Sequence, residues 1–361
     1  YKTFMWPSKF WGEYEYFIRK AAGLGKSPTV DDPDQYEHFH YHCDVLVVGG
    51  GISGMYAAEL AAKSNLKVLL LEQKSKAGGE INNDPDTRFK TVAGKAMDNL
   101  PARLFDEIYA NTKRLNNVKI VTDTTVFAYM HHNYLLACQK INNSNIRQII
   151  WKIRAKKVVL ATGSVERPLT FHNNDRPGIM LSHSARQYAS RNCDLGKNIV
   201  IFTNNDYAYQ TAIDFKLLDT FIKVTVVDLR NNSKGDLIEV AKDLGVHILF
   251  NHIITNTKGR KKINSVFIKK IDGETNKIIG NYGKIPCDLL CISGGWTPTV
   301  HLFTQSKGKL IYRESDATFV PNKSFQHEVS VGTCNGTFTL DKIIDETHDK
   351  ISKLIFDLGG K

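Results

Sequence analysis

The chain contains 361 residues, of which 42% are hydrophobic and 24% are charged, proportions that are typical of a globular protein with a substantial core. No apolar run approaches the roughly 20 residues that span a bilayer, and no secretion signal opens the chain, so we expect a cytoplasmic protein that contacts no membrane. The net charge of +11 would suit nucleic acid, but the lysines are scattered apart from one cluster at Lys258–Lys262, and we expect no nucleic-acid partner.

Residues 1–42 form an aromatic-rich lead segment that precedes the first recognisable domain. Its middle predicts a short helix that ends near Gly23, and the Asp31-Asp-Pro-Asp34 run predicts a turn. We expect the aromatic side chains to pack on the body of the protein or on a partner; they are Phe4, Trp6, Phe10, Trp11, Tyr14 and Tyr16.

A glycine fingerprint follows the apolar run Cys43-Asp-Val-Leu-Val-Val48, which is typical of a buried parallel strand. Three glycines then precede a helix of small residues: the first allows a tight turn, the second lets backbone approach a pyrophosphate, and the third lets helix and strand pack closely. The helix N-terminus offers free N–H groups to phosphates. The residues expected to hold the pyrophosphate are Gly49, Gly51, Ser53 and Gly54.

A second apolar strand, Lys67–Leu71, ends in Glu72, which lies 18 residues past Gly54. An acid at this place accepts hydrogen bonds from the ribose of an adenosine, and we expect Gln73 and Lys74 to lie beside it. A later Gly78-Gly79 pair is similar to one in flavoproteins with two dinucleotide domains, so Gly79 is added to the site. No cysteine pair follows it, which argues against a disulfide reductase.

Short alternating runs between residues 118 and 160 predict a small meander with a return strand. Val126, which we place at the end of a meander strand, resembles the position that flanks adenine in the same flavoproteins. The segment Val158–Gly163 resembles their strand-to-loop segment near the dinucleotide, so Thr162 and Gly163 are expected to line its far end.

Residues 198–230 repeat the strand–helix–strand pattern, and a helix near 235–245, a strand VHILF and a hairpin follow. The stretch Lys258–Lys262, a basic cluster, is typical of an exposed hairpin end. Where this second unit would carry a glycine fingerprint it has Thr203-Asn-Asn-Asp206. Side chains there would crowd a pyrophosphate, so we expect no second nicotinamide dinucleotide.

Six cysteines are present, but none forms a Cys-x-x-Cys pair, so we expect no metal or iron–sulfur site and predict reduced thiols. The histidines are dispersed, and we assign no catalytic residue. The predicted fold class is α/β, with two nested Rossmann-like dinucleotide-binding-type domains. We place the first at 43–165 plus 287–361 and insert the second at 166–286.

Three blocks carry a more specific resemblance: VVLATGSVERPLTFHNNDRPGIML, IVIFTNNDYAYQTA and CDLLCISGGWTPTVHLFTQSKGKL. Together with the opening FMWPSKFW and the closing SVGTCNG, they resemble the large (alpha) subunit of heterotetrameric sarcosine oxidases across nearly the whole chain. The folate-binding domain of that family would lie beyond residue 361.

The resemblance implies oxidative demethylation of sarcosine to glycine and formaldehyde with formation of hydrogen peroxide. It implies NAD in this chain, FMN at the interface with a partner subunit, substrate oxidation at a flavin in that other chain, and beta, gamma and delta subunits as partners. Gly332 and Thr333 would line the far end of the dinucleotide. Many FAD enzymes have Asp where Thr333 stands, which favours NAD over the alternative, FAD.

Two other interpretations stay open. One is a subunit of an FAD-dependent opine or proline dehydrogenase. The other is an assembly subunit whose dinucleotide is structural and never changes its redox state.

Overall fold

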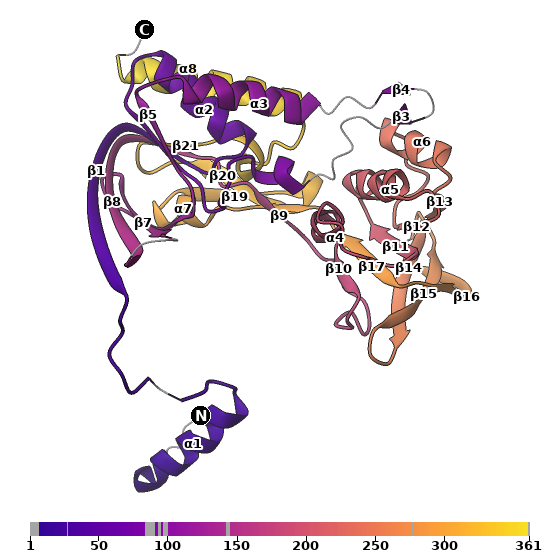
Figure 1. The fold of residues 1–361 in the computed structure, drawn as a ribbon. Helices are drawn as coiled ribbons and strands as arrows, with labels where there is room; N and C mark the ends of the chain where they lie inside the picture. The colour runs from indigo at the N-terminus through magenta and orange to yellow at the C-terminus, as the bar shows by residue number, and fades with distance from the viewer. Residues whose placement is uncertain are drawn as a thin grey trace.

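The computed structural model describes residues 7–26, 28–83, 91–92, 95–96, 100–141, 145–275 and 277–359. Two separate α/β bodies stand side by side in Figure 1, each built on its own sheet. The first sheet has the order β5-β2-β1-β8-β7-β6, and β21 pairs with the end of β8. Its strands are β1 (Gln35–Val48), β2 (Val68–Leu71), β5 (Val118–Val121), β6 (Thr124–Met130), β7 (Tyr134–Lys140), β8 (Ile146–Leu160) and β21 (Glu328–Ser330).

Three helices cover one face of this sheet, where the parallel strands bury continuous apolar runs. They are α2 (Ile52–Lys63), α3 (Leu100–Lys113) and α8 (Leu340–Asp357). The small side chains of α2, such as Ala57, Ala58 and Ala61, are fully buried and let the helix approach the strands closely. The opposite face packs on α7 (His301–Gln305), and the hairpin β19 (Lys309–Arg313) and β20 (Thr318–Lys323) follows it.

The second sheet is parallel throughout, with the order β10-β17-β11-β12-β13. Its strands are β10 (Ile179–Leu181), β11 (Asn198–Thr203), β12 (Lys223–Asp228), β13 (His247–Phe250) and β17 (Leu289–Ser293). One face is covered by α4 (Ser182–Ala189), α5 (Tyr207–Leu218) and α6 (Asp236–Asp243). The other face packs on an antiparallel meander of β14 (His252–Gly259), β15 (Ile263–Ile271) and β16 (Ile278–Pro286).

The predicted α/β class with two Rossmann-like units is confirmed, but two of the predicted boundaries are wrong. The strand β17 lies between β10 and β11, so the chain re-enters the first body only after Ser293 and not at residue 287. The strand β1 begins at Gln35 and pairs with β8 from there, so residues 35–42 belong to the first sheet and not to the lead segment.

The lead helix α1 (Trp11–Ala21) stands away from both bodies in Figure 1 and buries none of its residues. Phe10, Trp11, Tyr14 and Tyr16 are all exposed, so the expected packing of these aromatics on the body is wrong. Phe4 and Trp6 lie outside the described residues. None of the helices in the described part of the chain combines the length and apolar character that crossing a bilayer requires.

Two short strands connect the bodies. In the first crossing the chain passes through β9 (Ser164–Glu166), and it returns through β18 (Trp296–Pro298), which pairs antiparallel with β9. The remaining elements are the pair β3 (Thr91–Val92) and β4 (Lys95–Ala96) and the 3₁₀ turns η2 (Ser8–Phe10), η3 (Gly79–Asn83), η4 (Glu314–Asp316) and η5 (Gly332–Asn335).

Gly54→Ala should destabilise the first body. A Cβ at Gly54 would lie 1.9 Å from the Gly49 carbonyl oxygen and 3.1 Å from the Ala161 Cβ, so helix and strand must separate, which costs about 1–3 kcal/mol. Urea unfolding checks this. Gly12→Ala is the control, because its Cβ would meet nothing within 4 Å, and equal stability of the two variants would contradict the close approach.

Candidate dinucleotide-binding site

The loop between β1 and α2 has the geometry that the glycine fingerprint predicts. Gly49 has φ +106°, in the region that favours glycine, and a Cβ there would lie 2.2 Å from the Ala161 carbonyl oxygen. Gly49 and Gly54 are therefore fixed by the packing of β1, β8 and α2 against one another.

Gly51 differs from these two glycines because space is open above it. A Cβ at Gly51 would meet only the Cα of Gly79, at 3.9 Å. Gly51 is the N-cap of α2, and the first bond inside the helix runs from the Met55 N–H to the Gly51 carbonyl at 2.9 Å. The N–H groups of Ile52, Ser53 and Gly54 precede that bond and have no partner within the helix. This combination of free donors and open space fits a diphosphate.

The carboxylate of Glu72 is held rigidly at the end of β2. It is buried, and it accepts hydrogen bonds from the Gly50 N–H at 2.6 Å and from the Lys74 N–H at 2.8 Å. A carboxylate has about four acceptor positions, so two remain for the hydroxyls of a ribose. The first sheet thus fixes the acid beside the glycine loop before any ligand arrives.

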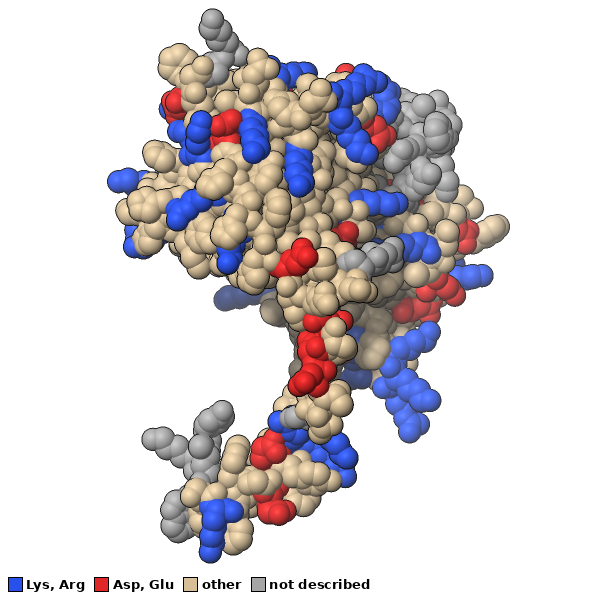
Figure 2. All heavy atoms as spheres, turned by 60° about the vertical axis from the view of Figure 1, so that its left-hand side comes forward, with Lys and Arg blue, Asp and Glu red and all other residues tan. Residues whose placement is uncertain are grey.

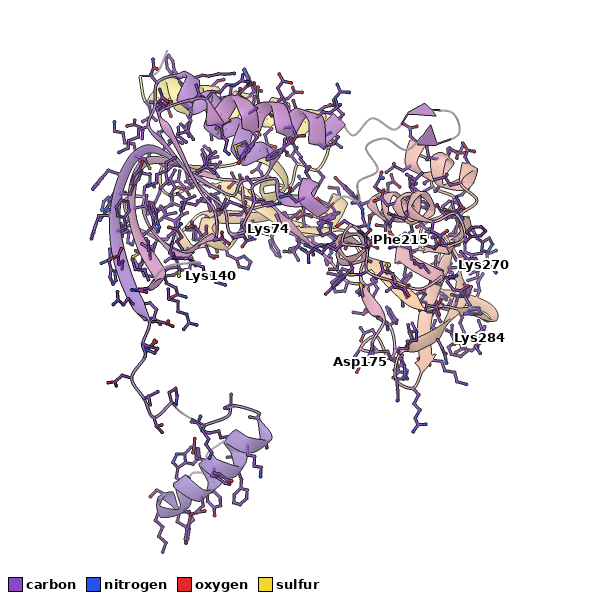
Figure 3. All side chains as sticks on the ribbon, viewed as in Figure 1. Lys74, Lys140, Asp175, Phe215, Lys270 and Lys284 are labelled. Carbon is purple, nitrogen blue, oxygen red and sulfur yellow. The ribbon has the colours of Figure 1, made fainter. Side chains whose placement is uncertain are left out.

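The neighbours of Glu72 differ in their surroundings. Lys74 donates from Nζ to the Gly79 carbonyl at 3.3 Å and lies inside the first body in Figure 3, whereas Gln73 is exposed. Val126 lies near the start of β6 and not at the end of a strand, which corrects the predicted placement. The preceding Thr124 N–H donates to the Glu72 carbonyl at 2.8 Å, so the start of β6 is tied to the acid.

The predicted far end of the site comes together around the start of α2. A Cβ at Gly332 would lie 2.1 Å from the Ser53 Oγ, and one at Gly163 would lie 3.9 Å from the Thr333 Oγ1. Thr162 donates its hydroxyl proton to the Thr299 carbonyl at 2.7 Å. Ser53 is buried under Gly332, so we expect it to offer its backbone N–H, and not its hydroxyl, to a phosphate.

The corresponding loop of the second body is filled by protein. Asn205 donates from Nδ2 to the Ser293 carbonyl at 3.0 Å, while its Oδ1 accepts the Tyr207 N–H at the start of α5 at 3.1 Å. An asparagine side chain thus makes the contacts that would be left to a phosphate in a glycine loop.

Charged side chains fill the space between this loop and the end of β12, which we call the crevice of the second body. Arg230 donates to the buried Asp228 at 2.8 Å and to Asp206 at 2.8 Å. Burial works against the charge of Arg230, but its hydrogen bonds to Asp228 and Asp206 outweigh burial and raise its pKa. The acid that ends β12 is therefore occupied by an arginine and not free to accept the hydroxyls of a ribose.

The junction between the bodies contains polar residues that lie outside the predicted dinucleotide site. Glu166 in β9 is buried and accepts the His183 N–H at the start of α4 at 2.8 Å; burial raises the pKa of its carboxyl. The His183 Nε2 also contacts the Glu80 carboxylate of η3. The Trp296 ring lies edge-on to His183, and its buried Nε1 has no hydrogen-bond partner among the residues that the structure describes. No spacing rule links these residues, because four separate elements bring them together.

All six cysteines are free. Burial raises the pKa of Cys287 to about 12 and also raises the pKa of Cys291, which leaves both thiols protonated and inert. Among the described residues, no three His, Cys, Asp or Glu side chains gather in a way that could hold a metal ion.

Residues 43–329 match the family described as pyridine nucleotide-disulphide oxidoreductase. The chain is 34% identical to the sarcosine oxidase subunit alpha of Corynebacterium sp. (strain U-96), over 87% of this chain and 32% of that protein. It is 31% identical to the subunit of the same name from Rhizobium meliloti (strain 1021), over 99% of this chain and 35% of that protein. The predicted resemblance is thereby confirmed.

The fold is similar to that of L-proline dehydrogenase from P. horikoshii, with a TM-score of 0.63 and 20% identity over 91% of this chain and 58% of that one. The chain spans about a third of the length of the curated relatives named above.

Proposed function

Because the chain belongs to the pyridine nucleotide-disulphide oxidoreductase family, we propose that it is the NAD-binding part of a sarcosine-oxidase-type alpha subunit. The observation that carries this proposal is the pairing of open space above Gly51 with the fixed carboxylate of Glu72. The α2 N-terminus would hold the diphosphate, and Glu72 would accept the ribose hydroxyls. The residues beside them would be Gln73, Lys74, Gly79, Val126, Thr162, Gly163, Gly332 and Thr333.

We favour NAD over FAD because Thr333 offers a neutral hydroxyl near Gly163 where many FAD enzymes have a carboxylate. The experiment is acid extraction of the purified full-length protein, followed by mass measurement of the released nucleotide. NAD at about one per chain is the expected result. FAD released from this chain would favour an opine or proline dehydrogenase subunit, and no nucleotide at all would refute the site.

We place the amine chemistry outside this chain. Substrate oxidation would take place at a flavin in a partner subunit, FMN would lie at the interface with that subunit, and the beta, gamma and delta subunits would complete the assembly. Adding sarcosine to the whole complex and following the absorbance of reduced nicotinamide tests the role of NAD. Bound NAD that stays oxidised while peroxide forms would assign it a structural role.

Glu72→Gln should weaken NAD binding about tenfold, or about 1.4 kcal/mol. One carboxylate oxygen becomes an amide donor that faces either the Gly50 N–H or the Lys74 N–H, so a buried hydrogen bond is lost and the acid no longer holds its position. Calorimetric titration of the nucleotide-free protein measures the effect. The exposed Glu314→Gln is the control, and unchanged affinity for NAD in Glu72→Gln would remove Glu72 from the site.

A further inference from the structure

More than half of the net charge of the chain lies on one small sheet. The basic sheet, defined here as residues 252–286 with β14, β15 and β16, contains eight Lys or Arg side chains against two carboxylates, so it has a charge of +6 out of a total of +11. Lys and Arg side chains project together at the lower right of Figure 2. The cations are Lys258, Arg260, Lys261, Lys262, Lys269, Lys270, Lys277 and Lys284.

These cations have few acidic partners within the protein, although the charge of Lys262 contributes to lowering the pKa of the nearby Asp288 carboxyl. None of the eight forms an ion pair with a carboxylate in the part of the chain that the structure describes. Of the two acids in the sheet, Asp272 uses its carboxylate within the turn that it begins. There it accepts hydrogen bonds from the Thr275 N–H and hydroxyl, both at 2.8 Å. A positive field of this size attracts acidic surfaces over about a Debye length, roughly 10 Å at 0.1 M salt.

The outer face of the basic sheet also has a hollow of about 540 Å³ with aromatic walls. It is lined by Phe267 and Tyr282 together with His172, Thr255 and Asn256. The Lys269 Nζ lies 3.9 Å from the centre of the Tyr282 ring, and Lys284 is the cross-strand neighbour of Phe267. Figure 3 shows Lys270 and Lys284 on the outer side of this body.

Two polar atoms of the hollow, the Asn256 Oδ1 and the Thr255 hydroxyl, already bond to protein groups and are not free to orient a small ligand. The Asn256 Oδ1 accepts the Asn173 Nδ2 at 2.8 Å and the Thr257 N–H at 2.7 Å, and the Thr255 hydroxyl donates to the Phe267 carbonyl at 3.3 Å. A pocket for a small molecule needs free polar groups to orient it. What this surface offers is aromatic faces and ammonium groups.

Apolar side chains on the edge strand extend this surface. Ile278, Ile279 and Tyr282 of β16 are 51%, 42% and 67% exposed. Aromatic and apolar side chains that lie beside unpaired charges are typical of protein interfaces, where charge complementarity guides the encounter. Nucleic acid would be held by cations on its phosphates and by bases stacked on aromatic rings, and the exposed Ile278 and Ile279 would serve neither contact.

We propose that the outer face of the basic sheet binds an acidic surface of another protein subunit, with an apolar side chain of that subunit seated against Phe267 and Tyr282. This inference does not depend on which nucleotide the first body binds, because the basic sheet lies in the second body.

The test uses the full-length protein together with the subunits that copurify with it. A carbodiimide, which joins amines to carboxylates in direct contact, should link Lys270 or Lys284 to Asp or Glu residues of another chain, as read by mass spectrometry. Reversal of three exposed, unpaired cations, in Lys261→Glu/Lys270→Glu/Lys284→Glu, should weaken the association with that subunit at least about tenfold. Tyr282→Ser should weaken it with the salt dependence unchanged, because it removes apolar contact and not charge.

The control is Lys223→Glu/Lys234→Glu/Lys323→Glu, which makes the same change in charge at exposed lysines outside the basic sheet. Circular dichroism and bound-nucleotide content should match the wild type in both triple variants. Failure to bind a nucleotide would count against the proposed function, and not against the proposed protein interface. The inference is overturned if the full-length protein purifies as a single chain, if no cross-link reaches the basic sheet, or if both triple variants bind the subunit equally. Retention of a labelled oligonucleotide that only the basic-sheet reversal abolishes would assign the surface to nucleic acid and would also overturn it.

Discussion

Gly51→Val is expected to abolish copurification of NAD while the chain stays folded. The φ of Gly51 is −73° and its ψ is −175°, values that valine adopts readily. A Cβ meets nothing closer than the Gly79 Cα at 3.9 Å, so the protein has room for the first carbon of the side chain. The branched side chain instead occupies the space where a diphosphate would approach the N–H groups of α2. We expect affinity for NAD to fall at least about 100-fold, or about 2.8 kcal/mol.

The measurement is nucleotide content after acid extraction, together with calorimetric titration of NAD. Gly235→Val is the matched control, because Gly235 is the N-cap of α6 in extended backbone and a Cβ there would meet only the Asp206 Oδ2 at 3.7 Å. Retention of stoichiometric NAD in Gly51→Val, with a normal thermal midpoint, would show that the nucleotide lies elsewhere.

The glycine loop and Glu72 could be placed from the sequence because their roles are local. A strand, a turn and a helix within about 30 residues leave few ways to arrange Gly49, Gly51 and Gly54. The first part of β1 could not be placed, because residues 35–42 alternate histidines with aromatics and become a strand only through pairing with β8, over 100 residues away. The same holds for β17, whose apolar sequence suits either sheet and whose partners, β10 and β11, decide its place.

The side-chain contacts at the junction between the bodies could not be predicted from the sequence, for the same reason. Glu166 and His183 come from different elements. The N–H of His183 needs an acceptor because it lies in the first turn of α4, and only the folded chain brings Glu166 to it. In the second body, Thr203–Asp206 could be recognised as a departure from a glycine loop. That the Asn205 side chain bonds Ser293 could not be foreseen, because Ser293 ends a strand whose place in the sheet was itself unknown.

Arg230→Met is expected to destabilise the second body by about 3–5 kcal/mol. This is the usual cost of removing one partner of a buried ion pair, because the other charge then stays buried without compensation. Asp228 is fully buried and accepts hydrogen bonds from the Arg230 N–H, Nε and Nη2 and from the Tyr209 hydroxyl. Burial, followed by the charge of Asp228, raises the pKa of Tyr209, so the phenol stays a neutral donor. Methionine has about the same volume as arginine. The Asp228 carboxylate would then keep only two hydrogen-bond donors, the backbone N–H of residue 230 and the Tyr209 hydroxyl.

Urea unfolding with a far-ultraviolet probe measures the loss, and the double variant Asp228→Asn/Arg230→Met shows its cause. The amide of Asn removes the buried charge, so the double variant should recover more than half of the stability lost by Arg230→Met alone. If the loss were only that of arginine packing, the double variant would be no more stable than the single one. A loss below about 1 kcal/mol in Arg230→Met, the range of exposed ion pairs, would mean that solvent reaches Asp228. The crevice of the second body would then be open, and the argument that protein groups have replaced a second dinucleotide there would fail.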